Sequence, residues 1–176
     1  MKTLKLSLMA FSAALLLNSC TPSPEEARIY NDEIIGLENP LAEKETAFID
    51  MLSDDKSPEE MKKAYDDLVK QSDEAMSGIE KVEAFDNSTA FRDAAKEYFA
   101  TFRSIATNEY KSILDLAAKN PEEITDDDSK KYEDLLASVQ DKSEKALAKI
   151  QTEQSAFAAK YKFEIEKEPN VEQARP

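Results

Sequence analysis

The sequence predicts an all-α protein, built as an elongated antiparallel bundle of four helices in up-down-up-down order. Glycine occurs twice and valine four times in 176 residues, whereas alanine, glutamate, lysine and leucine are abundant, and this composition favours helix over sheet. Four stretches carry apolar residues at alternating three- and four-residue steps, which is the period of a helix with one buried face. Short polar segments separate the four stretches, so neighbouring helices are expected to pack antiparallel.

The first nineteen residues have the features of an export signal. Lys2 and Lys5 form a positive region without an acidic residue, and residues 6–17 form an apolar run interrupted by two serines. About a dozen apolar residues are too few to cross the ~30 Å core of a bilayer as a helix. Residues 1–19 are therefore interpreted as a signal peptide that is removed from the mature protein.

The first helix is predicted over residues 24–53. Ser23 is a suitable N-cap, and Pro24 suits the first helical position. At residues 36–40 a glycine and a proline interrupt the pattern, and proline inside a helix removes a hydrogen bond and clashes with the preceding turn. A kink or short break is therefore expected there. The apolar stripe comprises Ala27, Tyr30, Ile34, Leu37, Leu41, Phe48 and Leu52, with Glu45 in its one gap.

The second and third helices are predicted over residues 57–84 and 88–119. Ser57 and Glu60 have the spacing of a capping box, and Pro121 lies just beyond the end of the third helix. The third helix has the widest apolar face and is expected to be the most deeply buried. Its stripe comprises Phe91, Ala94, Ala95, Tyr98, Phe99, Phe102, Ile105, Ala106, Tyr110, Ile113, Leu114 and Ala117.

The fourth helix is predicted over residues 126–163 and completes a bundle domain that spans residues 24–163. The polar residues 164–176 contain two prolines and are interpreted as a flexible tail. The stripe of the fourth helix comprises Tyr132, Leu135, Leu136, Val139, Ser143, Ala146, Leu147, Ile150, Phe157 and Tyr161.

Residues 17–20, Leu-Asn-Ser-Cys, resemble the lipobox of bacterial lipoprotein signal peptides. In that family the cysteine sulfur carries a diacylglycerol, the chain is cut before the cysteine, and the new amino group is often acylated as well. The resemblance implies lipid attachment at Cys20, followed by a tether of residues 20–23. Cys20 is the only cysteine, so it has no disulfide partner within the chain. The alternatives are an ordinary secretory signal that contains a cysteine, or an N-terminal membrane helix.

The body of the chain, residues 27–165, resembles a family of uncharacterised helical lipoproteins and surface proteins from Bacteroidetes and spirochaetes. The similar segments are Tyr-Asn-Asp at residues 30–32, the segment 79–85, the aromatic residues 98–102 and the ending 156–163. The resemblance implies an exported, membrane-attached helical domain, and it brings no catalytic residues with it.

The composition excludes several classes of chemistry. Without histidine there is no serine or cysteine triad and no zinc or di-iron site that uses histidine. With glycine only at positions 36 and 78, no glycine-rich phosphate loop is possible. The net charge of −14 repels nucleic acid, so a macromolecular partner would be a cationic protein or peptide. We expect no enzyme, no cofactor, no metal ligand and no catalytic residue.

Three features of the sequence are candidate sites, and each also has a structural explanation. Glu45 could be a catalytic carboxylate, or an acid at a bundle end or at the kink that reaches solvent. The acidic run of residues 126–128 could bind calcium, but it lacks the glycine and the alternation of a calcium loop, and it suits the positive end of a helix. Tyr98, Phe99, Phe102 and Tyr110 could line a ligand pocket, although aromatic stripes at helical spacing usually form core.

The sequence thus predicts a non-enzymatic lipoprotein of the bacterial cell envelope, acting as a structural or interaction module. Thr21, in place of aspartate, follows the lipobox cysteine and favours the outer membrane under the enterobacterial sorting rule. The membrane face stays open between the periplasm and the cell surface. The alternative functions are a bundle that binds a small apolar ligand and an acidic decoy that binds a cationic protein.

Overall fold

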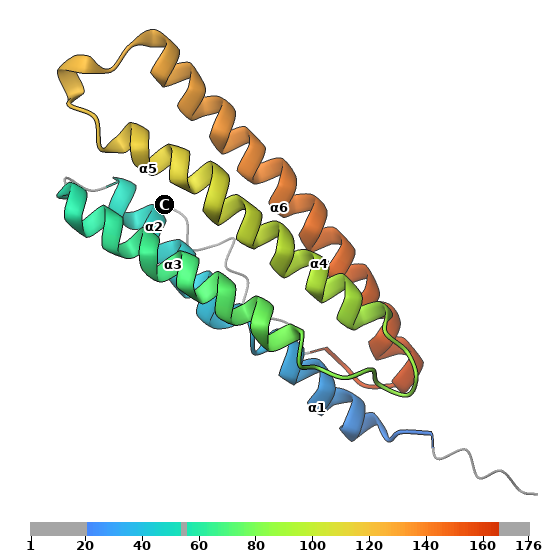
Figure 1. Ribbon diagram of the computed structural model, residues 1–176. Coiled ribbons are helices and arrows are strands. Elements are labelled where there is room, and N and C mark those ends of the chain that lie inside the picture. Colours follow the sequence, from blue (N-terminus) through green and yellow to red (C-terminus); the bar gives the residue numbers. More distant parts are fainter. Residues whose placement is uncertain (1–20, 54–55, 166–176) are drawn as a thin grey trace, which may run out of the picture.

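The computed structural model describes residues 21–53 and 56–165, and within them it confirms an all-helical bundle without strands (Figure 1). Four rods run along the length of the molecule. The first rod is α1 (Pro24–Ile35) and α2 (Glu38–Ser53), and the second is α3 (Pro58–Ile79). The third is α4 (Ala90–Ile105), the π-helical η1 (Ala106–Tyr110) and α5 (Lys111–Ala117), and the fourth is α6 (Asp126–Tyr161), preceded by the 3₁₀ turn η2 (Pro121–Glu123).

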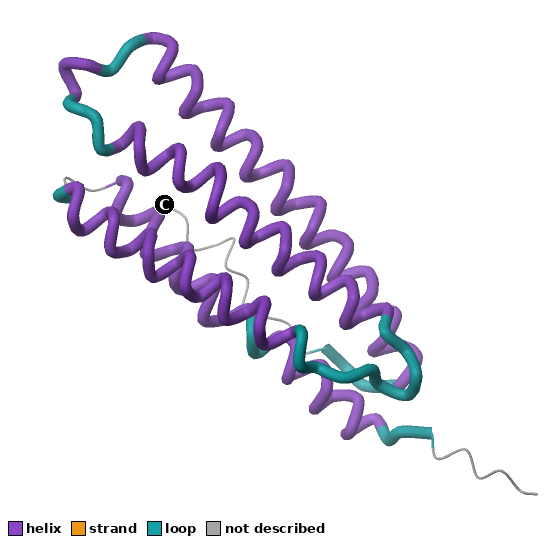
Figure 2. Tube along the Cα trace, in the orientation of Figure 1, coloured by secondary structure: helices purple, strands orange, loops and turns teal. Residues whose placement is uncertain are grey.

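Successive rods are antiparallel, as Figure 2 shows along the Cα trace. Helix α3 packs between α2 and α4, and α6 packs against α4 and α1. The first and third rods therefore lie diagonally across the bundle. We call the end where α1 begins and α6 ends the N-terminal end, and the opposite end, where α6 begins, the distal end. No helix of residues 21–53 and 56–165 has both the length and the hydropathy needed to cross a membrane.

The predicted break in the first helix is confirmed. Helix α1 ends at Ile35, α2 begins at Glu38, and the rod bends by 26°. The N–H of Gly36 donates to Asp32 O at 2.8 Å, which closes α1 before the chain turns. Pro40 then lies in the first turn of α2, where a backbone N–H has no helical partner in any case. The stripe resumes after the bend, since Leu41 and Phe48 are fully buried.

Helix α3 ends at Ile79, about one turn before the predicted end near residue 84. The N–H groups of Lys81 and Val82 bond only three residues back, so the chain leaves the helix in turns. A tight turn follows, with positive φ of 50° at Asp86 and 56° at Asn87. This conformation suits aspartate and asparagine better than other non-glycine residues.

The third predicted helix is interrupted by the π-helical segment η1, which we did not predict. Apolar residues four positions apart drift by about 40° per step around an α-helix, because a full turn takes 3.6 residues. The wider π turn absorbs this drift and keeps the whole series facing the core. The series consists of Tyr98, Phe102, Ala106, Tyr110 and Leu114, all of them buried. Beyond this series, Ala117 is exposed, although we expected it in the buried stripe. Leu116 is buried in its place.

Helix α6 ends at Tyr161, two residues before the predicted end. Lys162 adopts the left-handed conformation with φ of 61°, and the N–H of Phe163 returns to Ala158 O at 3.2 Å. This is a helix C-cap in which the chain reverses onto its own last turn. Leu136 and Leu147, which we assigned to the buried stripe, are 44% and 39% exposed.

Candidate functional site

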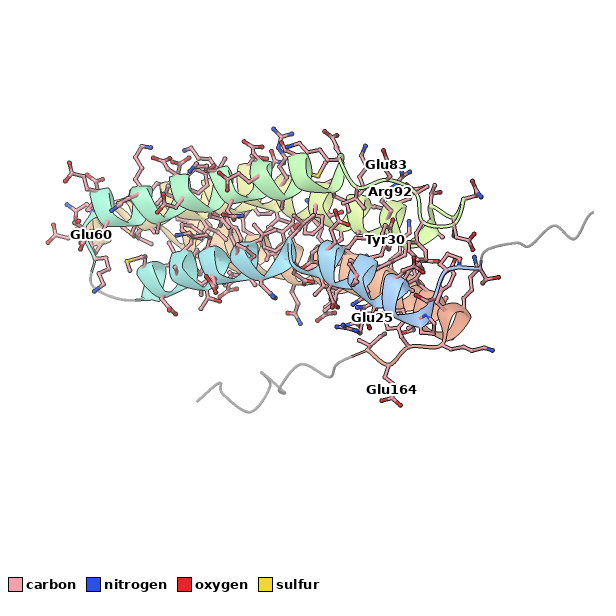
Figure 3. All side chains as sticks on the ribbon, turned by 90° about the horizontal axis from the view of Figure 1, so that it is seen from below. Glu25, Tyr30, Glu60, Glu83, Arg92 and Glu164 are labelled. Atoms are coloured by element: carbon pink, nitrogen blue, oxygen red, sulfur yellow. The ribbon has the colours of Figure 1, made fainter. Side chains whose placement is uncertain are left out.

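An aromatic cluster fills the N-terminal end of the bundle and centres on Phe157 of α6. Its ring centroid lies 5.5 Å from Tyr30 of α1, 5.4 Å from Phe85 and 5.4 Å from Phe91 of α4. Tyr161 lies 4.8 Å away and Phe163 5.9 Å away. Figure 3 shows Tyr30 lying between the helices at this end. The cluster ties three of the four rods together where the chain enters the fold.

The polar atoms of this cluster are satisfied by the loop that joins α3 to α4. The hydroxyl of Tyr30 donates to Glu83 O at 2.9 Å, and that of Tyr161 donates to Asp86 Oδ2 at 2.9 Å. Burial raises the pKa of Tyr30 to about 12, so its hydroxyl stays protonated as a donor. These bonds favour a structural role for the cluster over a ligand site.

The four aromatic residues that could have lined a pocket lie in the core. Phe99 and Phe102 are 1% and 6% exposed. Tyr98 donates to Glu38 Oε1 at 2.8 Å, and Tyr110 donates to Glu45 Oε1. Both bonds cross the diagonal of the bundle from the third rod to the first.

Glu45 therefore has a structural role that differs from the expected one. It lies in the middle of α2, so the expected position at a bundle end or a kink is wrong. Its side chain is half-buried, keeps some exposure to solvent and accepts a hydrogen bond from Tyr110. Burial and the adjacent Glu45 carboxylate raise the pKa of Tyr110 above its ordinary value. The carboxylate accepts a hydrogen bond from a neutral tyrosine, and that partner explains why a glutamate occupies a gap in an apolar stripe.

Glu109 is a buried acid that sequence reasoning missed. It lies in η1 and is 8% exposed. Its Oε1 accepts from Lys142 Nζ at 2.6 Å and from Ser138 Oγ at 3.3 Å, both on α6. The π turn carries Glu109 toward α6, because it rotates the residues after Ala106 relative to a regular helix. Its charge is thus held between two rods at mid-length of the bundle.

The acidic run at residues 126–128 begins α6, as the helix-dipole explanation predicted. Asp128 Oδ2 accepts from the N–H and the hydroxyl of Thr125 at 3.1 and 2.8 Å, and Asp128 N–H donates to Thr125 Oγ at 3.2 Å. Asp128 Oδ1 accepts from Lys119 Nζ at 2.6 Å. Within the described residues, no group of three or more acidic or cysteine side chains is placed to hold a metal ion.

Replacing Asp128 with asparagine is expected to have a pH-dependent effect on stability. The hydrogen bond from Lys119 and those from Thr125 lower the pKa of Asp128 to about 2, from an ordinary 3.8. A lowered folded-state pKa contributes stability above the ordinary value and loses it as the pH falls toward 2. Asp128→Asn should therefore shift the urea midpoint at pH 5 and progressively less at pH 3 and pH 2.

The control for this titration is Asp127→Asn, which changes an exposed aspartate in the same helical turn. Asp127→Asn removes a charge at the same positive end of α6, and it should shift the urea midpoint at pH 5 by less than Asp128→Asn does. A difference between the wild type and Asp128→Asn that stays constant from pH 5 to pH 2 would contradict the role assigned to the Asp128 charge.

A cavity of about 620 Å³ opens at the distal end. Leu52 of α2 and Met61 of α3 line it from one side, and Leu116 of α5, Ile124 and Tyr132 of α6 line it from the other. Lys56, Lys119 and Asp128 are among its polar lining residues. The volume, and a lining that combines apolar side chains with a few polar ones, are typical of sites for small ligands. A hollow of similar volume along α3 draws its lining from that helix and the turn after it, so it is not enclosed by two rods.

The predicted lipid-attachment residue, Cys20, lies outside the described residues, as do the signal peptide and most of the predicted tail. The distal cavity could not be found from the sequence, because its lining comes from two distant stretches, residues 52–61 and 116–133, that only the fold brings together. A scan of family models, a search of curated proteins and a search of solved structures each found no match to this chain.

Proposed function

We propose that this chain is a lipid-anchored module of a bacterial cell envelope, attached by Cys20 and acting without catalysis in structure or interaction. The observation that supports this is the short interval between the lipobox cysteine and the fold. Ser23 caps α1 and Glu26 completes the capping box, so the first helix begins directly after Thr21 and Pro22. Three residues span about 10 Å at most. A lipid on Cys20 would hold the N-terminal end close to the membrane.

The proposed location is the outer membrane, with the long axis of the bundle leading away from the attachment point. The aromatic cluster would then face the membrane side and the distal cavity would face away from it. Strong negative charge disfavours contact of the bundle surface with anionic lipid. The distal end is therefore the part best placed to meet a partner or ligand.

Replacing Cys20 with alanine tests the anchor. Wild-type protein should incorporate labelled palmitate and sediment with membranes, whereas Cys20→Ala should incorporate none, because no thiol remains to accept the lipid. Ser23→Ala is the matched control, since it removes a helix cap three residues away and leaves the thiol in place. Unlabelled wild-type protein would contradict the proposal.

The second candidate function is a bundle that binds a small apolar ligand. The distal cavity supports it, because its volume suits a small ligand. Met61 and Leu116, from two neighbouring rods, give it an apolar interior. The two functions are compatible, since an anchored module can carry a ligand at the end that faces away from its membrane.

A further inference from the structure

The lining of the distal cavity separates into an apolar interior and a charged margin. Met61 and Leu116 are each only 6% exposed, and Leu52 and Tyr132 are half-buried. Ile124 is 41% exposed and lines the same cavity. An apolar ligand body bound there would remove this isoleucine from water, which favours binding.

Two lysines reach the margin from neighbouring rods. Lys56 precedes α3, and Lys119 follows α5. Acidic side chains outnumber basic ones by 37 to 23 in the whole chain, so a cavity lined by two lysines is less acidic than the average surface. The acids of the lining are Asp128 and Glu133, which balance these cations in number.

The charge of Asp128 is already engaged on both of its oxygens. One oxygen accepts two hydrogen bonds from Thr125 at the start of α6, and the other accepts from Lys119. An ammonium group has three N–H donors, and Asp128 takes one from Lys119. Lys119 is 41% exposed, so its ammonium group can meet a ligand at the cavity margin.

We propose that the distal cavity binds an anionic amphiphile, with the apolar part against Met61, Leu116 and Ile124 and the anionic head at Lys119. The proposal deepens the ligand-binding candidate function and rests on it. The protein would recognise such a ligand by a charge-assisted hydrogen bond to its anionic head and by burial of its apolar part.

Three ten-carbon probes that differ in the charge of the head test the proposal. They are decanoate, decanol and decyltrimethylammonium, each titrated at pH 7.5 into the full chain carrying Cys20→Ser, so that no attached lipid competes. Methyl signals of Met61, Leu116 and Ile124 in NMR spectra report binding at the cavity. We expect decanoate to bind most tightly and the cation least tightly, an order opposite to the one that the net charge of −14 would favour.

Lys119→Gln should weaken decanoate binding about tenfold and leave decanol binding unchanged, because it removes a charged donor and no apolar surface. Lys70→Gln is the control, since it removes an exposed lysine on α3 away from the cavity. Ile124→Asp should weaken the binding of decanoate and decanol. Circular dichroism on each variant checks that the bundle is intact.

Three outcomes would overturn the proposal in distinguishable ways. Equal affinity for decanoate and decanol, or unchanged decanoate binding in Lys119→Gln, would refute the anionic head and leave the ligand-binding candidate standing. Tighter binding of the cation would refute the head site as well. If no probe moves the methyl signals of the cavity, both the proposal and the ligand-binding candidate fail, while the lipid anchor is unaffected.

Discussion

Phe157→Ala is expected to lower the free energy of unfolding by about 3–5 kcal/mol, the range for removing a buried phenylalanine ring. Phe157 is 7% exposed, and its ring contacts aromatic rings from α1, from the loop before α4, from α4 and from the last turn of α6. Alanine would leave a cavity that these rings cannot fill, because Tyr30 and Tyr161 are held by hydrogen bonds to the same loop.

Urea unfolding followed by circular dichroism measures this change. Leu147→Ala is the control on the same helix, and it should cost less than about 1 kcal/mol, because Leu147 is 39% exposed. If the two variants lose stability equally, Phe157 is not the centre of the cluster and the packing at the N-terminal end is misassigned.

Lys142→Met is expected to lower the free energy of unfolding by about 2–3 kcal/mol. Removing Lys142 leaves the Glu109 carboxylate buried, with Ser138 as its other hydrogen-bond donor in the described residues. The expected loss is smaller than the 3–5 kcal/mol typical of fully buried pairs. The reason is that the Lys142 side chain is 40% exposed, so water already screens the pair.

A double variant separates the effect of the buried charge on stability from the effect of side-chain packing. Glu109→Met combined with Lys142→Met should recover most of the lost stability, since an apolar pair of similar volume needs no counter-charge. Lys145→Met is the control, because Lys145 is 73% exposed and pairs with Asp141 on the same helix. A Lys142→Met loss no larger than that of Lys145→Met would contradict the burial assigned to Glu109.

Local sequence signals predicted where the helices begin and where the first rod bends. Ser57 forms the expected capping box with Glu60, and Ser23, expected as an N-cap, forms one with Glu26, because the partners are neighbours in the chain. The bend of the first rod could also be predicted, because glycine and proline change the backbone within one helical turn of their own position. The end of α6 at the left-handed Lys162 carried no such signal, because neither glycine nor asparagine stands there.

The polar contacts inside the bundle could not be predicted, because each joins residues that are far apart in the sequence. Glu45 lies 65 positions from Tyr110, and Glu109 lies 33 from Lys142. A steady four-residue spacing from Tyr98 to Leu114 was the one available sign of the π turn, and with it of the burial of Glu109. The third rod lies diagonally opposite the first, and this arrangement decides which acidic side chains accept hydrogen bonds from the tyrosines.

Intact mass spectrometry of the protein extracted from the membranes of its native host tests the central claim most directly. The account predicts a chain that begins at Cys20 and carries the added mass of a diacylglycerol, with or without a further acyl group on the new amino terminus. A membrane-derived chain that begins at Cys20 without added lipid, or one that still carries residues 1–19, would contradict the proposed anchor.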